Sequence, residues 1–159
     1  MTIVDSIPVA LLSGFLLVAV CTDHRNHRIP NWLTGNMLLA GIATQTLIAG
    51  FDGLVTALAG MAVGLAVFLV PYAQRSMAAG DVKLMAAVGT FVGAKIVLIA
   101  SLISLIAGAS IGLSLLAYRQ FQKADAGVDA TLSMKFPYAS AIAIGTAAAL
   151  LSKEFQWTL

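Results

Sequence analysis

The sequence predicts an all-α fold, a polytopic helical bundle in a membrane. Of its 159 residues, 60% are hydrophobic and only 10% are charged, whereas soluble domains average about 45–50% and about 25%. The apolar residues form long runs, and a membrane-crossing helix needs about 20 of them. The basic residues are scattered singly and form no stripe, which argues against nucleic-acid binding.

The first half of the chain predicts three spans. The first covers residues 7–22, and because no basic segment precedes it we expect it to be retained and not cleaved as a signal peptide. Pro30 then fits the first turn of a new helix, where its missing N–H costs nothing. The second span covers 32–50, a tight turn 51–53 follows, and the third span covers 54–72.

The apolar run from 82 to 118 predicts two further spans. As one helix it would extend about 55 Å, which is too long for a single crossing. We therefore expect a break at 93–95, with a short fourth span over 82–92 and a fifth over 96–118. The fourth span would be only about 17 Å long, so neighbouring helices must shield it.

A polar loop over 119–135 and a sixth span over 139–151 complete the expected bundle of about six helices. The whole chain, 1–159, is expected to form a single membrane-embedded domain. The loops after the odd-numbered spans carry more basic residues than the opposite side, which predicts that they are cytoplasmic. These basic residues are Arg25, Arg28, Arg75, Lys83, Arg119, Lys123 and Lys135, against Lys95 and Lys153 on the other side.

Two carboxylates are expected to meet at the cytoplasmic end of the bundle. Asp23 follows the first span and Asp81 follows the third, so two crossings return the chain to the same face. The other acids fall outside or in the polar loop: Asp5, Asp52 and Glu154 outside, Asp125 and Asp129 in the loop. A single acid at the end of a span is often only interfacial, and Asp81 could simply stabilise a helix N-terminus.

A pair of carboxylates can hydrolyse an amide bond. One ionised aspartate takes a proton from water, while a protonated one donates to the carbonyl oxygen and then to the leaving amine. Two acids held close cannot both ionise easily, so their titrations are coupled. The pair Asp23 and Asp81 is therefore a candidate catalytic dyad.

Three segments together resemble the type IV prepilin peptidases, bacterial inner-membrane aspartic proteases of the glycine-x-glycine-aspartate class. They are Asp23 with Ile29-Pro30-Asn31-Trp32-Leu33-Thr34, then Gly80-Asp81-Val82-Lys83-Leu84-Met85-Ala86-Ala87-Val88-Gly89, then Phe136-Pro137-Tyr138-Ala139. The resemblance implies that Asp23 and Asp81 are catalytic. It also implies that Gly80, Lys83, Pro30 and Asn31 support the site, although Lys83 could equally be a cytoplasmic anchor.

The resemblance also implies a substrate class and a location. The substrates would be prepilins or pseudopilins, whose short leader is cut on the cytoplasmic side of the inner membrane. This chain has Ala78 at the first glycine position of the pattern and lacks the cysteine-bearing segment of the larger, methylating members. It therefore resembles the short members that process Flp-type prepilins, and we expect cleavage without methylation and without a cofactor or metal.

Two alternatives remain open at this stage. Cys21, His24 and His27 have a spacing that zinc could use, which would make the protein a metal-dependent hydrolase. The chain could also be a non-enzymatic membrane assembly subunit. The sequence makes no prediction of oligomeric state; the expected partners are the prepilin and the lipid bilayer.

Overall fold

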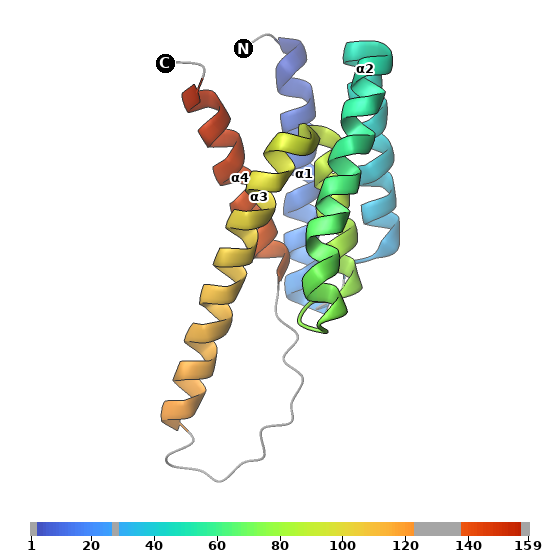
Figure 1. The fold of residues 1–159 in the computed structure, drawn as a ribbon. Helices are drawn as coiled ribbons and strands as arrows, with labels where there is room; N and C mark the ends of the chain where they lie inside the picture. The colour runs from blue at the N-terminus through green and yellow to red at the C-terminus, as the bar shows by residue number, and fades with distance from the viewer. Residues whose placement is uncertain (1–2, 27–28, 123–137, 157–159) are drawn as a thin grey trace.

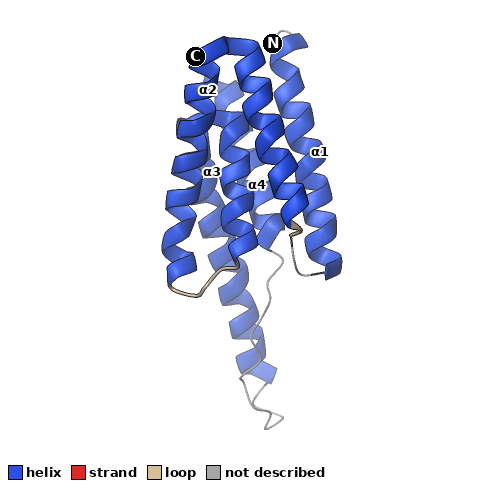
Figure 2. Ribbon diagram, turned by 90° about the vertical axis from the view of Figure 1, so that its right-hand side faces the viewer, coloured by secondary structure: helices blue, strands red, loops and turns tan. Residues whose placement is uncertain are grey.

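The computed structural model describes residues 3–26, 29–122 and 138–156, and these residues form a helical bundle (Figure 1). The helices are α1 (Ile3–Asn26), α2 (Asn31–Ala73), α3 (Ala79–Gln122) and α4 (Tyr138–Gln156). No strand occurs among these residues, and Figure 2 shows helices joined by short loops. The predicted all-α class is therefore confirmed.

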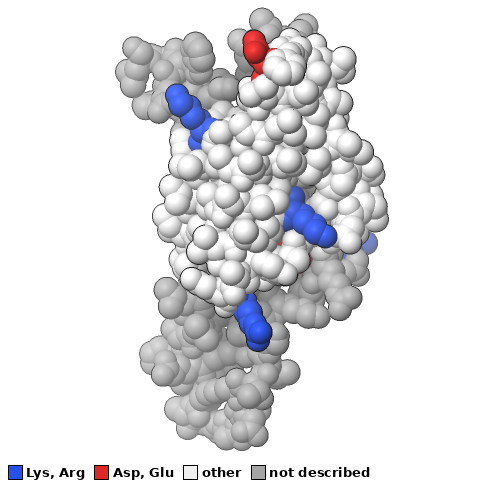
Figure 3. Space-filling model, turned by 45° about the vertical axis from the view of Figure 1, so that its right-hand side comes forward, with Lys and Arg blue, Asp and Glu red and all other residues white. Residues whose placement is uncertain are grey.

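The helices have the length and the surface expected of membrane spans. Three segments are long and apolar enough to cross a membrane, and a shorter apolar helix accompanies them: Ile7–Arg25, Asn31–Ala73 and Ala79–Ser110, with Tyr138–Leu151 as the shorter one. Large apolar side chains such as Leu47 and Ile106 are exposed, and Figure 3 shows a face with only isolated charges. Lipid is the environment in which such an apolar exterior is stable.

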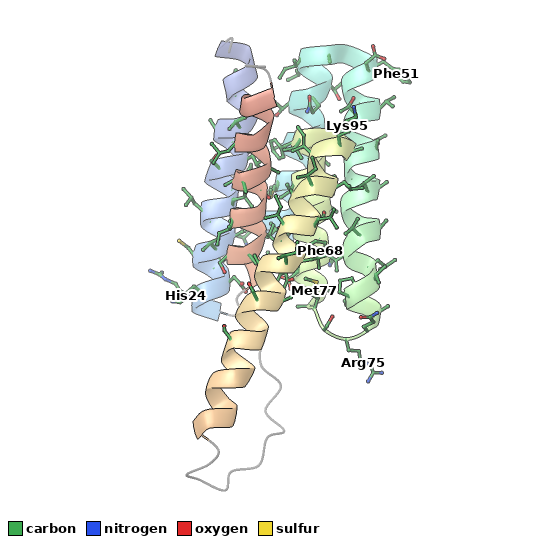
Figure 4. The ribbon with its side chains drawn as sticks, turned by 60° about the vertical axis from the view of Figure 1, so that its left-hand side comes forward. His24, Phe51, Phe68, Arg75, Met77 and Lys95 are labelled. Atoms are coloured by element: carbon green, nitrogen blue, oxygen red, sulfur yellow. The ribbon has the colours of Figure 1, made fainter. Side chains whose placement is uncertain are left out.

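The helix α2 folds back on itself at Gly50. Its 43 residues would extend about 65 Å if straight, roughly twice the hydrocarbon thickness of a bilayer. Gly50 has a non-helical backbone with φ 59° and ψ −133°, a conformation that glycine adopts without strain. We call residues 31–49 and 51–73 the first and second arms of α2; Phe51, at the turn, lies at the opposite end of the bundle from Arg75 (Figure 4).

The helix α3 has the same construction, with Gly93 at the turn. Its φ of 77° and ψ of 174° are again non-helical, and residues 79–92 and 94–122 form its first and second arms. The side-chain amide of Gln45 donates a hydrogen bond to the backbone carbonyl of Phe91. This bond satisfies a carbonyl at the end of the first arm, where the helical pattern is interrupted.

The expectation of about six separate helices is wrong, because the structure has four helices over the described residues. The chain reverses near both of the expected breaks, but each turn has a single non-helical glycine, Gly50 or Gly93, and no loop separates the two arms. Residues 119–122, which were expected in the polar loop, belong to α3 instead. Residues 123–137 lie outside the described part of the chain.

The first arm of α3 forms the centre of the bundle, with most of its side chains buried, as a short span shielded by its neighbours should be. It approaches the second arm of α2 backbone to backbone, because a Cβ atom on Gly60 would meet the carbonyl oxygen of Gly89. Gly41, in the first arm of α2, packs directly against Thr90. Small residues permit this close packing where lipid weakens the hydrophobic effect.

Candidate active site

The two predicted aspartates lie at the same end of the bundle. Asp23 is in the last turn of α1 and Asp81 is in the first turn of α3. Figure 4 shows His24, the neighbour of Asp23, and Met77, just before α3, at this end, with Phe51 and Lys95 at the opposite end. Helices that are separate in the sequence therefore deliver both carboxylates to one face.

Asp23 is held by the helix α4. Its side chain is buried, with 5% exposed, and its Oδ2 accepts a hydrogen bond from the backbone N–H of Ala139 at 3.1 Å. Ala139 lies in the first turn of α4, where backbone N–H groups have no partner within the helix. The positive end of α4 therefore stabilises and orients this carboxylate.

Asp81 is held by its own helix. It is also 5% exposed, and its Oδ2 accepts a hydrogen bond from the N–H of Ala78 at 3.2 Å. Its own N–H donates to the carbonyl oxygen of Ala78 at 3.1 Å. The first of these bonds is the one that the acid of a capping box makes from the third position of a helix to the N-cap N–H, whereas the second is a backbone turn bond, because alanine has no side-chain acceptor. Asp81 therefore caps the start of its own helix, which was the simpler interpretation of this residue.

Ala78 occupies the first position of the glycine-rich pattern without backbone strain. Arg75 is the non-glycine residue of the described chain with a positive φ, so the backbone of Ala78 does not need glycine. The methyl group of Ala78 therefore leaves the hydrogen bonds around Asp81 intact.

Both carboxylates are withdrawn from solvent at the same end of the bundle, Asp23 in the last turn of α1 and Asp81 in the first turn of α3. Tyr138, at the start of α4, lies beside the contact that holds Asp23. Two close carboxylates share protons, because ionising one makes it harder to ionise the other. Chemically, this arrangement can present one protonated and one ionised carboxyl group to a bound amide.

The predicted supporting residues connect the start of α2 with the start of α3. Lys83 donates a hydrogen bond from Nζ to Oδ1 of Asn31 at 3.0 Å, on the exposed side of the bundle. A Cβ atom on Gly80 would lie 3.4 Å from Cβ of Ile29, so these segments are in near contact. Pro30 is half-buried directly before α2, and its carbonyl accepts the first hydrogen bonds of that helix. These residues join the elements around Asp81.

The alternative metal ligands do not gather with the buried acids. Cys21 and His24 are exposed on α1, whereas Asp23 is buried. His27 lies outside the described residues, and within the described part no group of three possible ligands is found. Asp52 is exposed beside Phe51, while Asp125 and Asp129 also lie outside the described residues.

The contact between α4 and Asp23 could not be predicted from the sequence. The two bonded residues are 116 positions apart, and a backbone N–H leaves no mark in a sequence. The available signal is the segment Phe136-Pro137-Tyr138-Ala139, in which a proline directly precedes the helix start. Such a proline is typical near the beginning of a helix, but it does not reveal which side chain the helix end holds.

A comparison with protein families gives one match, to the type IV leader peptidase family, over residues 10–113. The match covers more than half of the chain and includes Asp23 and Asp81, the two buried acids. No curated protein matches the chain, and no solved structure does. The membrane-type helices and the family match together show that this chain belongs to the type IV leader peptidase family.

Proposed function

We propose that this protein is a membrane aspartic endopeptidase that removes the short leader peptide of Flp-type prepilins or pseudopilins. The observation that carries the proposal is the pair of buried carboxylates, Asp23 at the end of α1 and Asp81 at the start of α3, which lie at one end of the bundle. Membership of a leader peptidase family supports the reaction class. The whole chain, 1–159, acts as one membrane-embedded domain.

In the proposed reaction, one ionised aspartate removes a proton from water, and the resulting hydroxide attacks the carbonyl carbon of the scissile peptide bond. The protonated aspartate donates its proton to the carbonyl oxygen. Collapse of the tetrahedral intermediate breaks the C–N bond, and the amine leaves with a proton from the dyad. One water molecule is consumed, and the products are a new carboxyl terminus and a new amino terminus.

The protein groups needed for these steps are Asp23 and Asp81. The N–H of Ala139 and the N–H of Ala78 each fix one carboxylate oxygen, which limits the orientations that each acid can adopt. Pre-set orientation lowers the barrier because the reacting groups need not be arranged during the reaction. No cofactor or metal ion takes part in this scheme.

We further propose that the site faces the cytoplasm from the bacterial inner membrane. Arg25 and Arg75 lie near the two aspartates in the sequence, and Arg75 lies at the site end of the bundle in Figure 4. Basic residues favour the cytoplasmic side of a membrane protein. A prepilin leader that precedes a membrane-spanning segment would be cut at this face.

The experiment is co-expression of this chain with an Flp-type prepilin in a bacterial host that lacks its own prepilin peptidase. We expect a shorter pilin on a gel, and mass spectrometry should show the new amino terminus without an added methyl group. A methylated terminus would contradict the peptidase-only assignment. An uncut prepilin in the presence of membrane-inserted protein would favour the alternative of a non-enzymatic assembly subunit.

A further inference from the structure

Tyr138 links three parts of the bundle at the first residue of α4 (Tyr138–Gln156). Its hydroxyl lies 3.4 Å from the backbone carbonyl oxygen of Ser104, to which it donates a long hydrogen bond. Its ring meets that of Phe68 edge to face, with centroids 6.3 Å apart and an interplanar angle of 83°. These contacts attach the start of α4 to the second arm of α3 and the second arm of α2.

The ring of Tyr138 occupies space that only a glycine leaves free. A Cβ atom on Gly108 would overlap the hydroxyl and the adjacent ring carbons of Tyr138. Gly108 is buried in the second arm of α3, one helical turn beyond Ser104. The position of the tyrosine ring is therefore set by close packing as well as by the hydrogen bond.

The peptide unit that follows Tyr138 holds Asp23. The N–H of Ala139 belongs to this unit and donates to Oδ2 of Asp23 at 3.1 Å, so a displaced tyrosine would displace the donor. Tyr138 is the residue directly before this donor in the first turn of α4, so it lies beside the contact that holds Asp23. A change in how the tyrosine packs would thus be transmitted to the geometry of the carboxylate pair.

We propose that Tyr138 is a positioning residue of the site: by packing against Gly108 and Phe68 it fixes the Ala139 N–H that orients Asp23 toward Asp81. It acts through Asp23 and takes no part in bond making. This inference rests on the proposed peptidase function, because its consequence is a rate of cleavage.

The test measures kcat and KM for prepilin cleavage by the purified full chain in detergent, using Tyr138→Ala, Tyr138→Phe and Gly108→Ala. We expect Tyr138→Ala and Gly108→Ala to lower kcat roughly 10-fold to 100-fold, since small displacements of catalytic groups have effects of this size. KM should change less than about twofold, because substrate binding is intact. Tyr138→Phe should remain within about threefold of wild type, because it keeps the ring and loses only a long hydrogen bond.

Two further readouts separate positioning from a loss of folded protein. The pH dependence of kcat should change shape in Tyr138→Ala and Gly108→Ala, because the coupling between the two carboxylates depends on their separation; a smaller folded fraction would leave that shape unchanged. Gly14→Ala adds the same methyl group where nothing lies within 4 Å, so it should behave as wild type.

The role of Tyr138 is overturned if Tyr138→Ala keeps kcat within twofold of wild type, or if only KM rises. It is also overturned if Tyr138→Phe is as slow as Tyr138→Ala, because the hydroxyl would then act in the chemistry. Should Tyr138→Ala not fold, Gly108→Ala alone decides, and wild-type kcat in that variant contradicts the proposal. If the wild-type chain cleaves no prepilin, both the proposed function and this inference are overturned. If the wild type cleaves and Asp81→Asn does not, the proposed function stands, and a negative result with the Tyr138 variants overturns only the role of Tyr138.

Discussion

Asp23 and Asp81 differ in what holds them. Asp81 bonds to Ala78, three residues away, and would keep this bond in any structure that preserves the start of α3. Asp23 bonds to Ala139, which arrives from the far end of the chain. The geometry of the pair is therefore more sensitive to how α4 docks than to the local structure of α3.

Cleavage by the buried acids should need no metal ion. Treatment with EDTA, or the double change Cys21→Ser with His24→Ala, should leave the cleavage rate within about twofold of wild type, because these exposed residues do not gather with the buried acids. The measurement is prepilin cleavage in isolated membranes. Loss of activity that zinc restores would instead support the Cys21, His24 and His27 site.

Removing the hydrogen bond between Lys83 and Asn31 should lower the stability of the protein only slightly. It lies on the exposed side of the bundle, where a hydrogen bond contributes about 0.5–1.5 kcal/mol. Lys83→Met and Asn31→Ala should each lower thermal stability slightly in detergent, and the double variant should lose no more than either alone. Fully additive losses would show that the two side chains act independently.

At the scale of the elements, glycines decide both the turns and the closest contacts. Gly50 and Gly93 adopt positive φ values at the two reversals, and Gly60 and Gly89 allow the second arm of α2 to approach the first arm of α3. The central arm that begins with Asp81 is thereby enclosed on the side of α2. The position of Asp81 therefore depends on the packing of these arms.

Gly60→Ala is predicted to destabilise the protein without changing the site directly. The added methyl group would meet the backbone carbonyl of Gly89, which cannot move as a flexible side chain would, and overpacking of this kind costs about 1–3 kcal/mol. Thermal unfolding in detergent should show a lower midpoint for Gly60→Ala and not for Gly14→Ala, whose Cβ meets nothing within 4 Å. Equal midpoints would contradict the close contact between these arms.

The sequence predicts those elements of the fold that depend on patterns of neighbouring residues. Hydrophobic run length predicted the helical class, and the excess length of the run from 82 to 118 predicted the reversal that occurs at Gly93. The number of helices was wrong because run length shows where a chain must turn, but not that a single non-helical glycine can make the turn with no loop between the two arms. The same holds for the site: the two aspartates stand out as isolated charges, whereas the Ala139 bond depends on packing between distant segments.

At the scale of the whole molecule, the bundle has two chemically different ends. Both buried acids lie at the end marked by His24, Arg75 and Met77, while Phe51 and Lys95 mark the opposite end (Figure 4). The start of α1 and the end of α4 also lie at this opposite end (Figure 1). Both buried acids therefore lie toward one side of the membrane that the bundle spans.

The difference between the two ends of the bundle predicts which cysteines a reagent outside the cell can reach. Cys21 is the single cysteine of the chain and lies within a span, so it is replaced by serine. A cysteine introduced as Arg75→Cys, at an exposed position at the site end of the bundle, should be labelled by a membrane-impermeant maleimide only after the inner membrane is permeabilised. Cys introduced as Asp52→Cys in a Cys21→Ser background should be labelled in cells with only the outer membrane opened. Labelling in the reverse order would place the site outside the cytoplasm.

The dyad is tested by the cleavage rates of Asp23→Asn, Asp81→Asn and the double variant, each confirmed to insert into membranes. If the two acids act as one unit, each single change should lower kcat by about 10²–10⁴, and the double variant should be no slower than the slower single variant. Asp52→Asn, an exposed acid at the other end of the bundle, is the matched control and should cleave normally. Wild-type cleavage by either single variant, or losses that multiply in the double variant, would contradict the dyad.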